Sequence, residues 1–386
     1  MTARRVAALD GLRGLAIGLV LFHHFTIVLP ESVAGGLWRE LAQLGRYGVD
    51  LFFVLSGFLI TNILLGDRND LHYFRTFYAR RALRIFPLYY TVVLFSLVVL
   101  PKLLTLLPPD LAAEVHSQTE ASNWLWYTAY GTNFLIALKD HYTHGILDVG
   151  WSLCIEEHFY LIWPCVVYFF SERALKKICI FTIAAALALR IVLWMEGFSR
   201  LQIYMLTFTR IDMILFGALL AIGTRSHTPK DTPEDSRKDL RQLRMTGLIL
   251  LALAALGYFR YDSAAMNTIG YSLVGLFFMR GVRFGAHGDP GHPLNRALSH
   301  PAPVFFGKYS YAMYLFHLPV AYFTKHVVFK GADFHSLPGL AIMWQFLFYA
   351  VATALCVLSA LVSWYLLEKP ALSLKQRFVY ANDPKI

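Results

Sequence analysis

The sequence predicts an all-α fold, a polytopic integral membrane helical bundle of about ten transmembrane helices plus one re-entrant or interfacial segment. Of its 386 residues, 57% are hydrophobic and only 16% are charged, and the mean hydropathy is +0.50. Apolar runs of about 20 residues, long enough to cross a bilayer as helices, recur along the chain. This composition excludes an ordinary soluble domain.

Each expected span is an apolar run bounded by polar or basic residues. The spans cover residues 8–29, 47–66, 86–107, 151–171, 177–195, 208–224, 245–260, 266–282, 303–328 and 338–367. A further apolar stretch, residues 123–138, is short and rich in Trp and Tyr. We expect it to be interfacial or re-entrant, with Trp124, Trp126 and Tyr127 forming an interfacial belt. The alternative is that these rings stack on a sugar.

The basic segments set the orientation of the chain. They are residues 1–5, 68–84, 173–177, 225–244, 280–296 and the tail after Glu368. Placing all of them in the cytoplasm puts both termini inside and leaves residues 108–150 outside as one block. This arrangement explains the net charge of +10 without a nucleic-acid partner. We expect a transmembrane domain over residues 1–370 in the plasma (inner) membrane, surrounded by lipid, and a short cytoplasmic tail over residues 371–386.

The first span carries charged groups and imidazoles, namely Asp10, Arg13, His23 and His24. A charge inside a span is costly and marks a candidate functional site. Arg13 and His24 lie eleven residues apart, which returns to nearly the same helix face about 16 Å further along the axis. This face suits a long anionic ligand, although Arg13 could instead reach the interface and pair with Asp10. We expect this span to be retained, because no short apolar region with a cleavage site precedes it.

Two later segments add charge at the membrane. Arg80, Arg81 and Arg84 lie before the third span, where a phosphate site and the positive-inside rule are equally good explanations. The fourth span begins at its outer end with Glu156 and Glu157. Either carboxylate is therefore expected at a depth comparable to that of His24.

The sixth and ninth spans also contain polar residues. Arg210 and Asp212 enter the bilayer together in the sixth span, and a structural ion pair is the alternative to a binding role. Ser310 and His317 lie in the ninth span, where His317 could serve the donor or the acceptor channel. No metal site is expected, because the histidines lack a ligand partner at helical spacing.

Together these segments resemble the acyltransferase-3 family of polytopic membrane O-acyltransferases, and the resemblance covers nearly the whole chain. The family pattern Arg-x10-His falls on Arg13 and His24. The other matching segments, in the family's order, are GVxxFFVxSGF at 48–58, RRxxRIxP at 80–87, WSLxxEE at 151–157, RxD at 210–212 and SYxxYLxHxP at 310–319. One departure is His158, where such proteins often carry Gln.

The resemblance implies transfer of an acyl group, commonly acetyl from acetyl-CoA, to a hydroxyl of a carbohydrate or glycan acceptor. A cytoplasmic cluster of Arg13, Arg80, Arg81 and Arg84 would suit the phosphates of acyl-CoA. The remaining expected substrate-binding residues are Asp10, Arg210, Asp212, Ser310 and His317. The acceptor is expected to arrive from the outer side.

His24 is the expected catalytic base, paired with a carboxylate that orients it, and Glu157 is preferred to Glu156. Two mechanisms stay open. His24 could deprotonate the acceptor hydroxyl for direct attack on the thioester, or it could be acylated first and then pass the acyl group on.

Two other functions fit part of the pattern. A transporter or flippase for an anionic or lipid-linked solute would also use intramembrane Arg, Glu and His, although no internal repeat is evident. A sensor or assembly protein would use the buried polar residues only to hold helices together. Consumption of acetyl-CoA that depends on His24 separates the enzyme from both.

Overall fold

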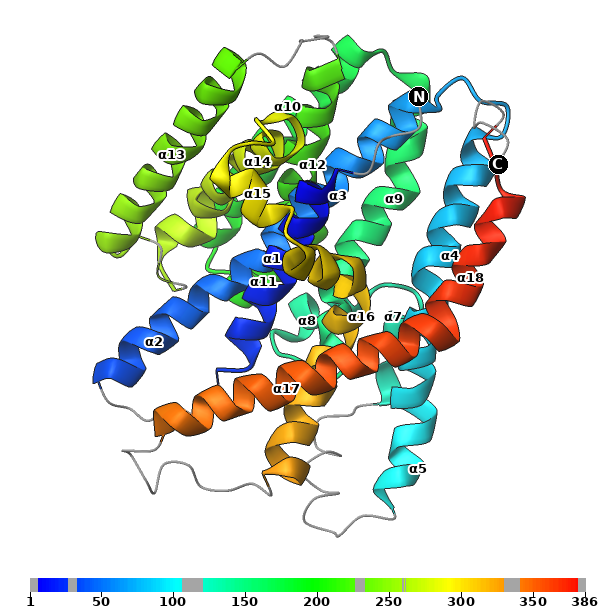
Figure 1. The fold of residues 1–386 in the computed structure, drawn as a ribbon, viewed down its shortest axis with the longest axis vertical. Coiled ribbons are helices and arrows are strands. Elements are labelled where there is room, and N and C mark those ends of the chain that lie inside the picture. The colour runs from blue at the N-terminus through cyan, green and yellow to red at the C-terminus, as the bar shows by residue number, and fades with distance from the viewer. Residues whose placement is uncertain are drawn as a thin grey trace.

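The computed structural model describes residues 6–26, 33–105, 121–225, 233–258, 260, 262–329 and 341–380. Within these ranges the fold is entirely helical and contains no strand, which confirms the predicted all-α class. Most of the long helices run along the length of the molecule, and α17 crosses obliquely in front of them (Figure 1). Parts of the expected spans and tail, residues 27–29, 106–107, 338–340 and 381–386, lie outside the described residues.

Every one of the ten apolar runs overlaps a long helix. These helices are α1 (Ala7–His24), α3 (Tyr47–Gly66), α4 (Tyr73–Leu94), α9 (Trp151–Phe169), α10 (Glu172–Met195), α12 (Thr207–Arg225), α13 (Pro233–Ala255), α14 (Tyr271–His287), α16 (Pro301–Phe323) and α17 (Ala341–Ser363). In the described part of the chain, five continuous helical segments are long and apolar enough to cross a membrane. They are Trp38–Gly66, Tyr73–Leu103, Glu172–Met195, Thr207–Arg225 and Ile342–Arg377.

The other five runs are interrupted by polar residues or are shorter. α1 and α9 carry the charged residues of the candidate site, and α14 has 17 residues. The first half of α13 is charged, so this helix extends through residues 233–244 into the basic segment 225–244. Lys, Arg, Glu and Leu favour helix, which explains this extension.

Shorter helices connect or extend the long ones. They are α2 (Val33–Gln43), η1 (Leu44–Arg46), η2 (Phe95–Val99), α5 (Leu100–Leu104), η3 (Ala121–Asn123), α7 (Trp124–Thr128), α8 (Thr132–Lys139), η4 (Asp148–Gly150), α11 (Arg200–Met205), η5 (Met266–Gly270), α15 (Pro293–Leu298), η6 (Thr324–Val328), η9 (Trp364–Glu368), α18 (Lys369–Ser373) and η10 (Leu374–Arg377). At the end of this series, α18 and η10 pack against α4.

The stretch 123–138 is two short helices, α7 and α8, separated by a turn in which Tyr130 has a positive φ of 55°. Neither helix approaches the roughly 20 residues that a span requires. α8 packs against α9 and α11. The placement of residues 123–138 at the interface or as a re-entrant segment stays a prediction.

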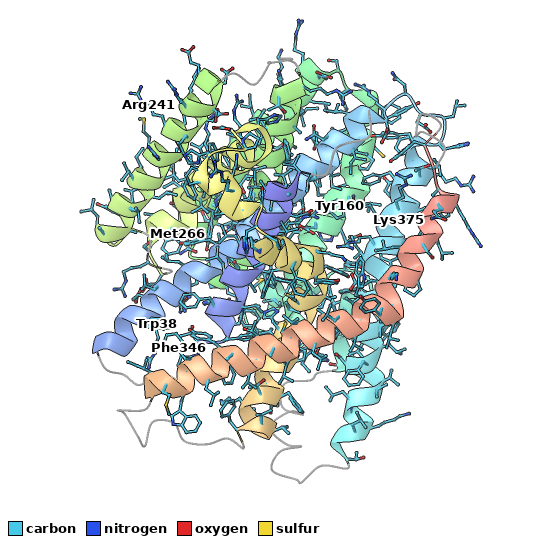
Figure 2. The ribbon with its side chains drawn as sticks, in the orientation of Figure 1. Trp38, Tyr160, Arg241, Met266, Phe346 and Lys375 are labelled. Atoms are coloured by element: carbon cyan, nitrogen blue, oxygen red, sulfur yellow. The ribbon has the colours of Figure 1, made fainter. Side chains whose placement is uncertain are left out.

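α1 lies at the centre of the bundle, in contact with α3, α14 and α16. α2 packs against α17, where the Trp38 and Phe346 rings are 5.7 Å apart (Figure 2). Trp38 also donates a hydrogen bond of 3.0 Å to the Tyr349 hydroxyl. The central position of α1 brings its charged and imidazole side chains inside the protein.

α3 and α12 approach most closely at Gly57 and Gly217, as small residues at a membrane-helix interface allow. A Cβ at Gly217 would lie 1.9 Å from the Val54 carbonyl oxygen, and one at Gly57 would lie 1.8 Å from the Ile214 carbonyl oxygen. Neither carbonyl belongs to a flexible side chain, so an added methyl group must separate the two helices.

We therefore expect Gly217→Ala to destabilise the protein by about 1–3 kcal/mol, the usual range for overpacking. The measurement is the thermal unfolding midpoint in detergent. Gly223→Ala on the same helix is the matched control, because a Cβ there meets nothing within 4 Å. Equal midpoints for the two variants would show that the close approach at Gly217 does not limit stability.

Candidate active site

The two ends of α1 open into different cavities. Arg13 lines a cavity of about 870 Å³, which we call the basic cavity, and His24 lines one of about 630 Å³, the histidine cavity. A smaller central cavity of about 110 Å³ also contains Arg13 in its wall. One helix therefore presents a guanidinium to one cavity and an imidazole to another.

The basic cavity gathers cations from several helices. Its positively charged lining residues are Arg13, Arg81, Arg84, Arg225, Lys308 and Lys375. Asp10 also lines it, with a carboxylate oxygen 3.8 Å from the Arg13 guanidinium. Figure 2 shows Lys375 near the end of the chain and Tyr160 deeper in the bundle, and both belong to this wall. The excess of positive charge suits a ligand with several phosphates.

The central cavity adjoins the basic cavity, with which it shares Arg13, Ser56, Arg81, Arg84 and Tyr160. Glu156 lies in its wall. The Glu156 carboxylate accepts a 2.6 Å hydrogen bond from the Ser56 hydroxyl and a 3.2 Å bond from the Tyr160 hydroxyl. This carboxylate therefore faces the guanidinium groups from a fixed position.

Ser310 and Tyr314 of α16 also line the central cavity. The Ser310 hydroxyl donates to the Gly307 carbonyl oxygen at 3.0 Å. The Tyr314 hydroxyl lies 2.6 Å from the Ser152 hydroxyl and 3.2 Å from the Val149 carbonyl oxygen. Tyr314 belongs to the histidine cavity as well, so the three cavities follow one another from Arg13 to His24.

His24 and His317 form a pair of imidazoles whose ring centroids are 4.7 Å apart. His24 Nδ1 lies 3.0 Å from the Val20 carbonyl oxygen, and His317 Nδ1 lies 2.6 Å from the Tyr314 carbonyl oxygen. Because a carbonyl oxygen only accepts, each Nδ1 carries a proton and each neutral ring keeps the lone pair on Nε2. His317 Nε2 is buried without a hydrogen-bond partner among the described residues. Both rings are thus held in the tautomer of a base.

The carboxylate expected beside His24 is not there. No hydrogen bond or ion pair in the described part of the chain joins His24 to Glu156 or Glu157. Ser152 lies at the level of Tyr314. Glu156 follows Ser152 by one helical turn, so it lies further toward the Arg13 end of the series of cavities. Glu157, preferred from the sequence, lines none of the three cavities, and its Oε1 is buried without a hydrogen-bond partner in the described region.

Arg80 does not join Arg81 and Arg84 at the cavities. Its Nε donates a 2.7 Å hydrogen bond to the Phe378 carbonyl oxygen, and its guanidinium lies 4.9 Å from the Tyr380 ring centroid. Successive residues of a helix point about 100° apart, which turns Arg80 toward the C-terminal segment while Arg81 faces inward.

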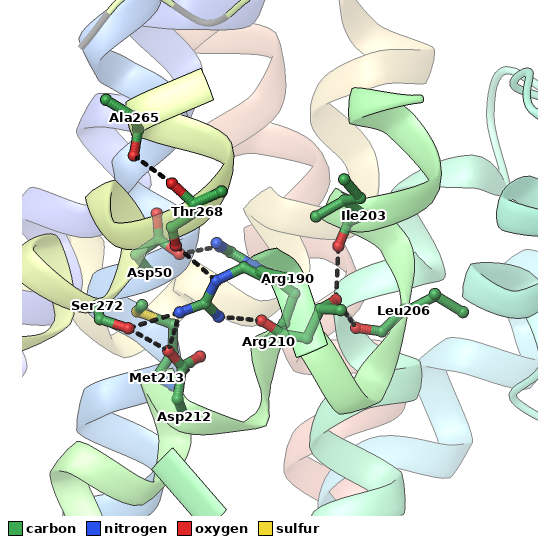
Figure 3. A network of polar contacts seen from close by, with 11 residues as sticks. Asp50, Arg190, Ile203, Leu206, Arg210, Asp212, Met213, Ala265, Thr268 and Ser272 are labelled. Atoms are coloured by element: carbon green, nitrogen blue, oxygen red, sulfur yellow. Dashed lines mark hydrogen bonds and ion pairs between the residues drawn. The ribbon is translucent and has the colours of Figure 1, made fainter. Parts of the chain in front are cut away.

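Arg210 and Asp212 do not pair with each other. Residues two apart on a helix lie on opposite faces, and each finds another partner: Arg210 forms an ion pair with Asp50 of α3, and Asp212 accepts from Arg190 of α10 at 2.8 Å (Figure 3). All four side chains are buried. The expected ion pair between Arg210 and Asp212 is therefore wrong, because each residue pairs with a residue of another helix. Neither residue lines the three cavities.

Several cavity residues were missed by the sequence interpretation. They are Ser56, Ser152, Tyr160, Lys308, Tyr314, Trp364 and Lys375. Ser56, Ser152 and Tyr314 lie within family segments and could have been chosen from them. Lys375 belongs to the expected tail, and only the packing of η10 against α4 brings it to the site. In the described residues, no group of three or more His, Cys, Asp or Glu gathers as a metal would require.

Comparisons with known proteins show which family the chain is similar to over most of its length. A family model described as an acyltransferase domain matches residues 6–366. The chain is 27% identical over 384 residues to the O-acetyltransferase OatA of Staphylococcus aureus, covering 95% of this chain and 57% of that protein. It is 29% identical over 339 residues to the peptidoglycan O-acetyltransferase OatA of Listeria monocytogenes, covering 84% of this chain and 50% of that protein. The chain thus spans about half the length of the curated relatives it matches, and no solved structure matches it.

Proposed function

The chain belongs to the acyltransferase-3 family, and from this premise we propose that it is a membrane O-acyltransferase that moves acetyl from acetyl-CoA to a hydroxyl of a carbohydrate acceptor. The observation that carries the proposal is the series of three cavities between Arg13 and His24. The names of both relatives support acetyl as the transferred group, and the peptidoglycan named for the Listeria monocytogenes relative supports a glycan acceptor.

The proposed topology has about ten spans in the plasma membrane, with both termini and the basic cavity on the cytoplasmic side. The clustering of basic segments supports this orientation. So does the arrangement of the helices, since the start of α1 and the end of α18 lie toward the same end of the molecule (Figure 1). The histidine cavity then faces outward.

Acetyl-CoA would bind with its phosphates in the basic cavity and its pantetheine arm directed through the central cavity. Arg13, Arg81 and Arg84 line both cavities and can hold the phosphates where the arm begins. Arg13 and His24 are about 16 Å apart along the axis of α1, a distance that a long flexible arm can bridge. The thioester would then lie between Tyr314 and His24.

In the proposed reaction, His24 Nε2 accepts the proton of the acceptor hydroxyl as that oxygen bonds to the thioester carbonyl carbon. The carbon–sulfur bond then breaks, and the leaving thiolate takes the proton from the imidazolium. The Ser152 and Tyr314 hydroxyls line the central cavity, and in the proposed reaction one of them exchanges its present hydrogen bond for one to the developing oxyanion. An acyl-histidine route uses the same nitrogen as the nucleophile and ends with the same products.

A transporter for an anionic solute is the second candidate, because three cavities in series also describe a path across a membrane. The purified protein in sealed vesicles distinguishes the two functions. The proposed enzyme consumes acetyl-CoA supplied on the side of the basic cavity, and CoA is released on that side. A transporter moves a solute without breaking the thioester.

Arg81→Ala is expected to raise the KM for acetyl-CoA about 10-fold or more, because a charge-assisted bond to phosphate is lost. Arg80→Ala is the matched control: Arg80 contacts the Phe378 carbonyl and the Tyr380 ring instead, so this variant should lose thermal stability and keep its KM. The measurement is acetyl-CoA turnover against substrate concentration. An unchanged KM in Arg81→Ala, or equal changes in both variants, contradicts the proposed donor site.

A further inference from the structure

Two arginines that the proposed reaction does not use line the histidine cavity. Arg46 ends η1, and Arg200 begins α11, and both belong to the same cavity wall as His24. These residues come from segments more than 150 positions apart in the sequence. The fold therefore brings two guanidinium groups together around one space.

The other ionisable groups of this wall leave it with a net positive charge. Asp148 is its acidic residue, and the Asp148 carboxylate is already held within its own loop. It accepts hydrogen bonds from the backbone N–H groups of His144 and Gly145, both at 2.9 Å, and from the Thr143 hydroxyl at 3.1 Å. His23 and His24 each direct Nδ1 to a backbone carbonyl, as neutral imidazoles do.

The position of Arg46 and Arg200 is not explained by topology. In the proposed orientation they lie on the outer side, where the positive-inside rule gives no reason for arginine beside the membrane. A ligand in the histidine cavity would give these two guanidinium groups a further partner. Two guanidinium groups facing a cavity are suited to a carboxylate or phosphate, each of which accepts paired N–H bonds.

The rest of the wall suits a sugar. Gln43 offers an amide, and Tyr142, Trp151 and Tyr204 offer aromatic rings on which the apolar face of a sugar ring can pack. A volume of about 630 Å³ is within the usual range for small-molecule sites. A hydroxyl of a sugar bound here would lie beside His24.

We propose that the histidine cavity selects an anionic glycan, a sugar that carries a carboxylate or a phosphate. Arg46 and Arg200 bind the anionic group, and this contact positions a neighbouring hydroxyl at Nε2 of His24. The proposal rests on the proposed function for the role of the bound sugar, whereas binding itself can be measured without any acetyl transfer.

The experiment measures binding of defined glycans to the purified protein in nanodiscs with CoA present. The acidic probes are a hyaluronan tetrasaccharide, which carries carboxylates, and N-acetylglucosamine 1-phosphate. Their neutral counterparts are chitotetraose and N-acetylglucosamine. We expect at least one acidic probe to bind about 10- to 100-fold more tightly than its neutral counterpart, the effect of one charge-assisted contact. The pair that shows the difference identifies the anion.

The Arg46→Gln/Arg200→Gln double variant should abolish this preference and leave the neutral probes unchanged within about 3-fold. Arg39→Gln is the control, because Arg39 lies nearby in α2 and does not line the cavity. Equal binding of acidic and neutral probes, no binding of either acidic probe, or a preference that survives in a folded double variant each overturns the proposal.

Acetyl-CoA consumption, measured separately, distinguishes failure of this proposal from failure of the proposed function. If acidic probes bind through Arg46 and Arg200 but the protein never consumes acetyl-CoA, the anion site is supported and the acyltransferase function is contradicted. If the protein consumes acetyl-CoA but binds acidic and neutral glycans equally, the acyltransferase function is supported and the anion site is contradicted.

Discussion

His24→Ala is expected to lower kcat for acetyl transfer by about 10²–10⁴-fold, the usual contribution of a general base. The structure gives the physical reason: Nδ1 is bound to the Val20 carbonyl oxygen, so the free lone pair of the ring is on Nε2 beside the histidine cavity. Because that hydrogen bond lies within α1 itself, the variant should unfold at nearly the temperature of the wild type. The measurements are acetyl-CoA turnover and the thermal midpoint at matched yield.

His23→Ala is the matched control for this prediction. His23 lies next to His24, but its Nδ1 lies 3.0 Å from the carbonyl oxygen of Ala42 in α2. The variant should therefore loosen the contact between α1 and α2, lower the thermal midpoint and keep kcat within several-fold of the wild type. If the two variants lose activity equally, or if His24→Ala stays fully active, the chemistry does not depend on the His24 ring.

Arg190→Met is expected to destabilise the protein by about 3–5 kcal/mol, because removing one partner leaves a buried charge uncompensated. Arg190 donates to the Asp212 carboxylate at 2.8 Å, the Ser272 hydroxyl at 2.5 Å, the Thr268 carbonyl oxygen at 2.8 Å and the Thr209 carbonyl oxygen (Figure 3). These contacts join α10 to α12, η5 and α14.

The measurement is the thermal midpoint and the monodisperse fraction after purification. Arg173→Ala, at an exposed position of the same helix, should behave as the wild type does. The double variant Arg190→Met/Asp212→Leu should recover part of the loss, since exchanging both partners for apolar residues avoids the unpaired charge. A stable single variant, or a double variant with additive losses, would show that the ion pair does not hold these helices together.

Much of the fold could be predicted from the sequence because apolar length is a local property. The ten runs each overlap one of the ten long helices, and the eleven-residue spacing placed Arg13 and His24 on one face with no tertiary information. The local sequence pattern did not reveal where polar residues would lengthen or shorten a helix. α4 begins at Tyr73, so the basic run lies within the helix and not before it.

The partners of the polar residues depended on packing that no local pattern contains. Arg210 and Asp212 share a short motif, yet helix geometry sends them to Asp50 and Arg190 in other helices. Glu156 and Glu157 could not be ranked from the sequence, because adjacent residues differ only in the direction they face. The contact between Ser152 and Tyr314 fixes the depth of α9 in the bundle. At that depth the Glu156 carboxylate lies away from His24.

The small size of the central cavity limits the leak of protons across the membrane. A continuous column of water through the protein would let protons drain the electrochemical gradient across the membrane. Between the two larger cavities the path narrows to about 110 Å³ beside Tyr314, room for only a few water molecules. In the proposed reaction the pantetheine arm occupies this constriction and only the acetyl group leaves it on the far side, so an acetyl group can cross the membrane without a continuous column of water.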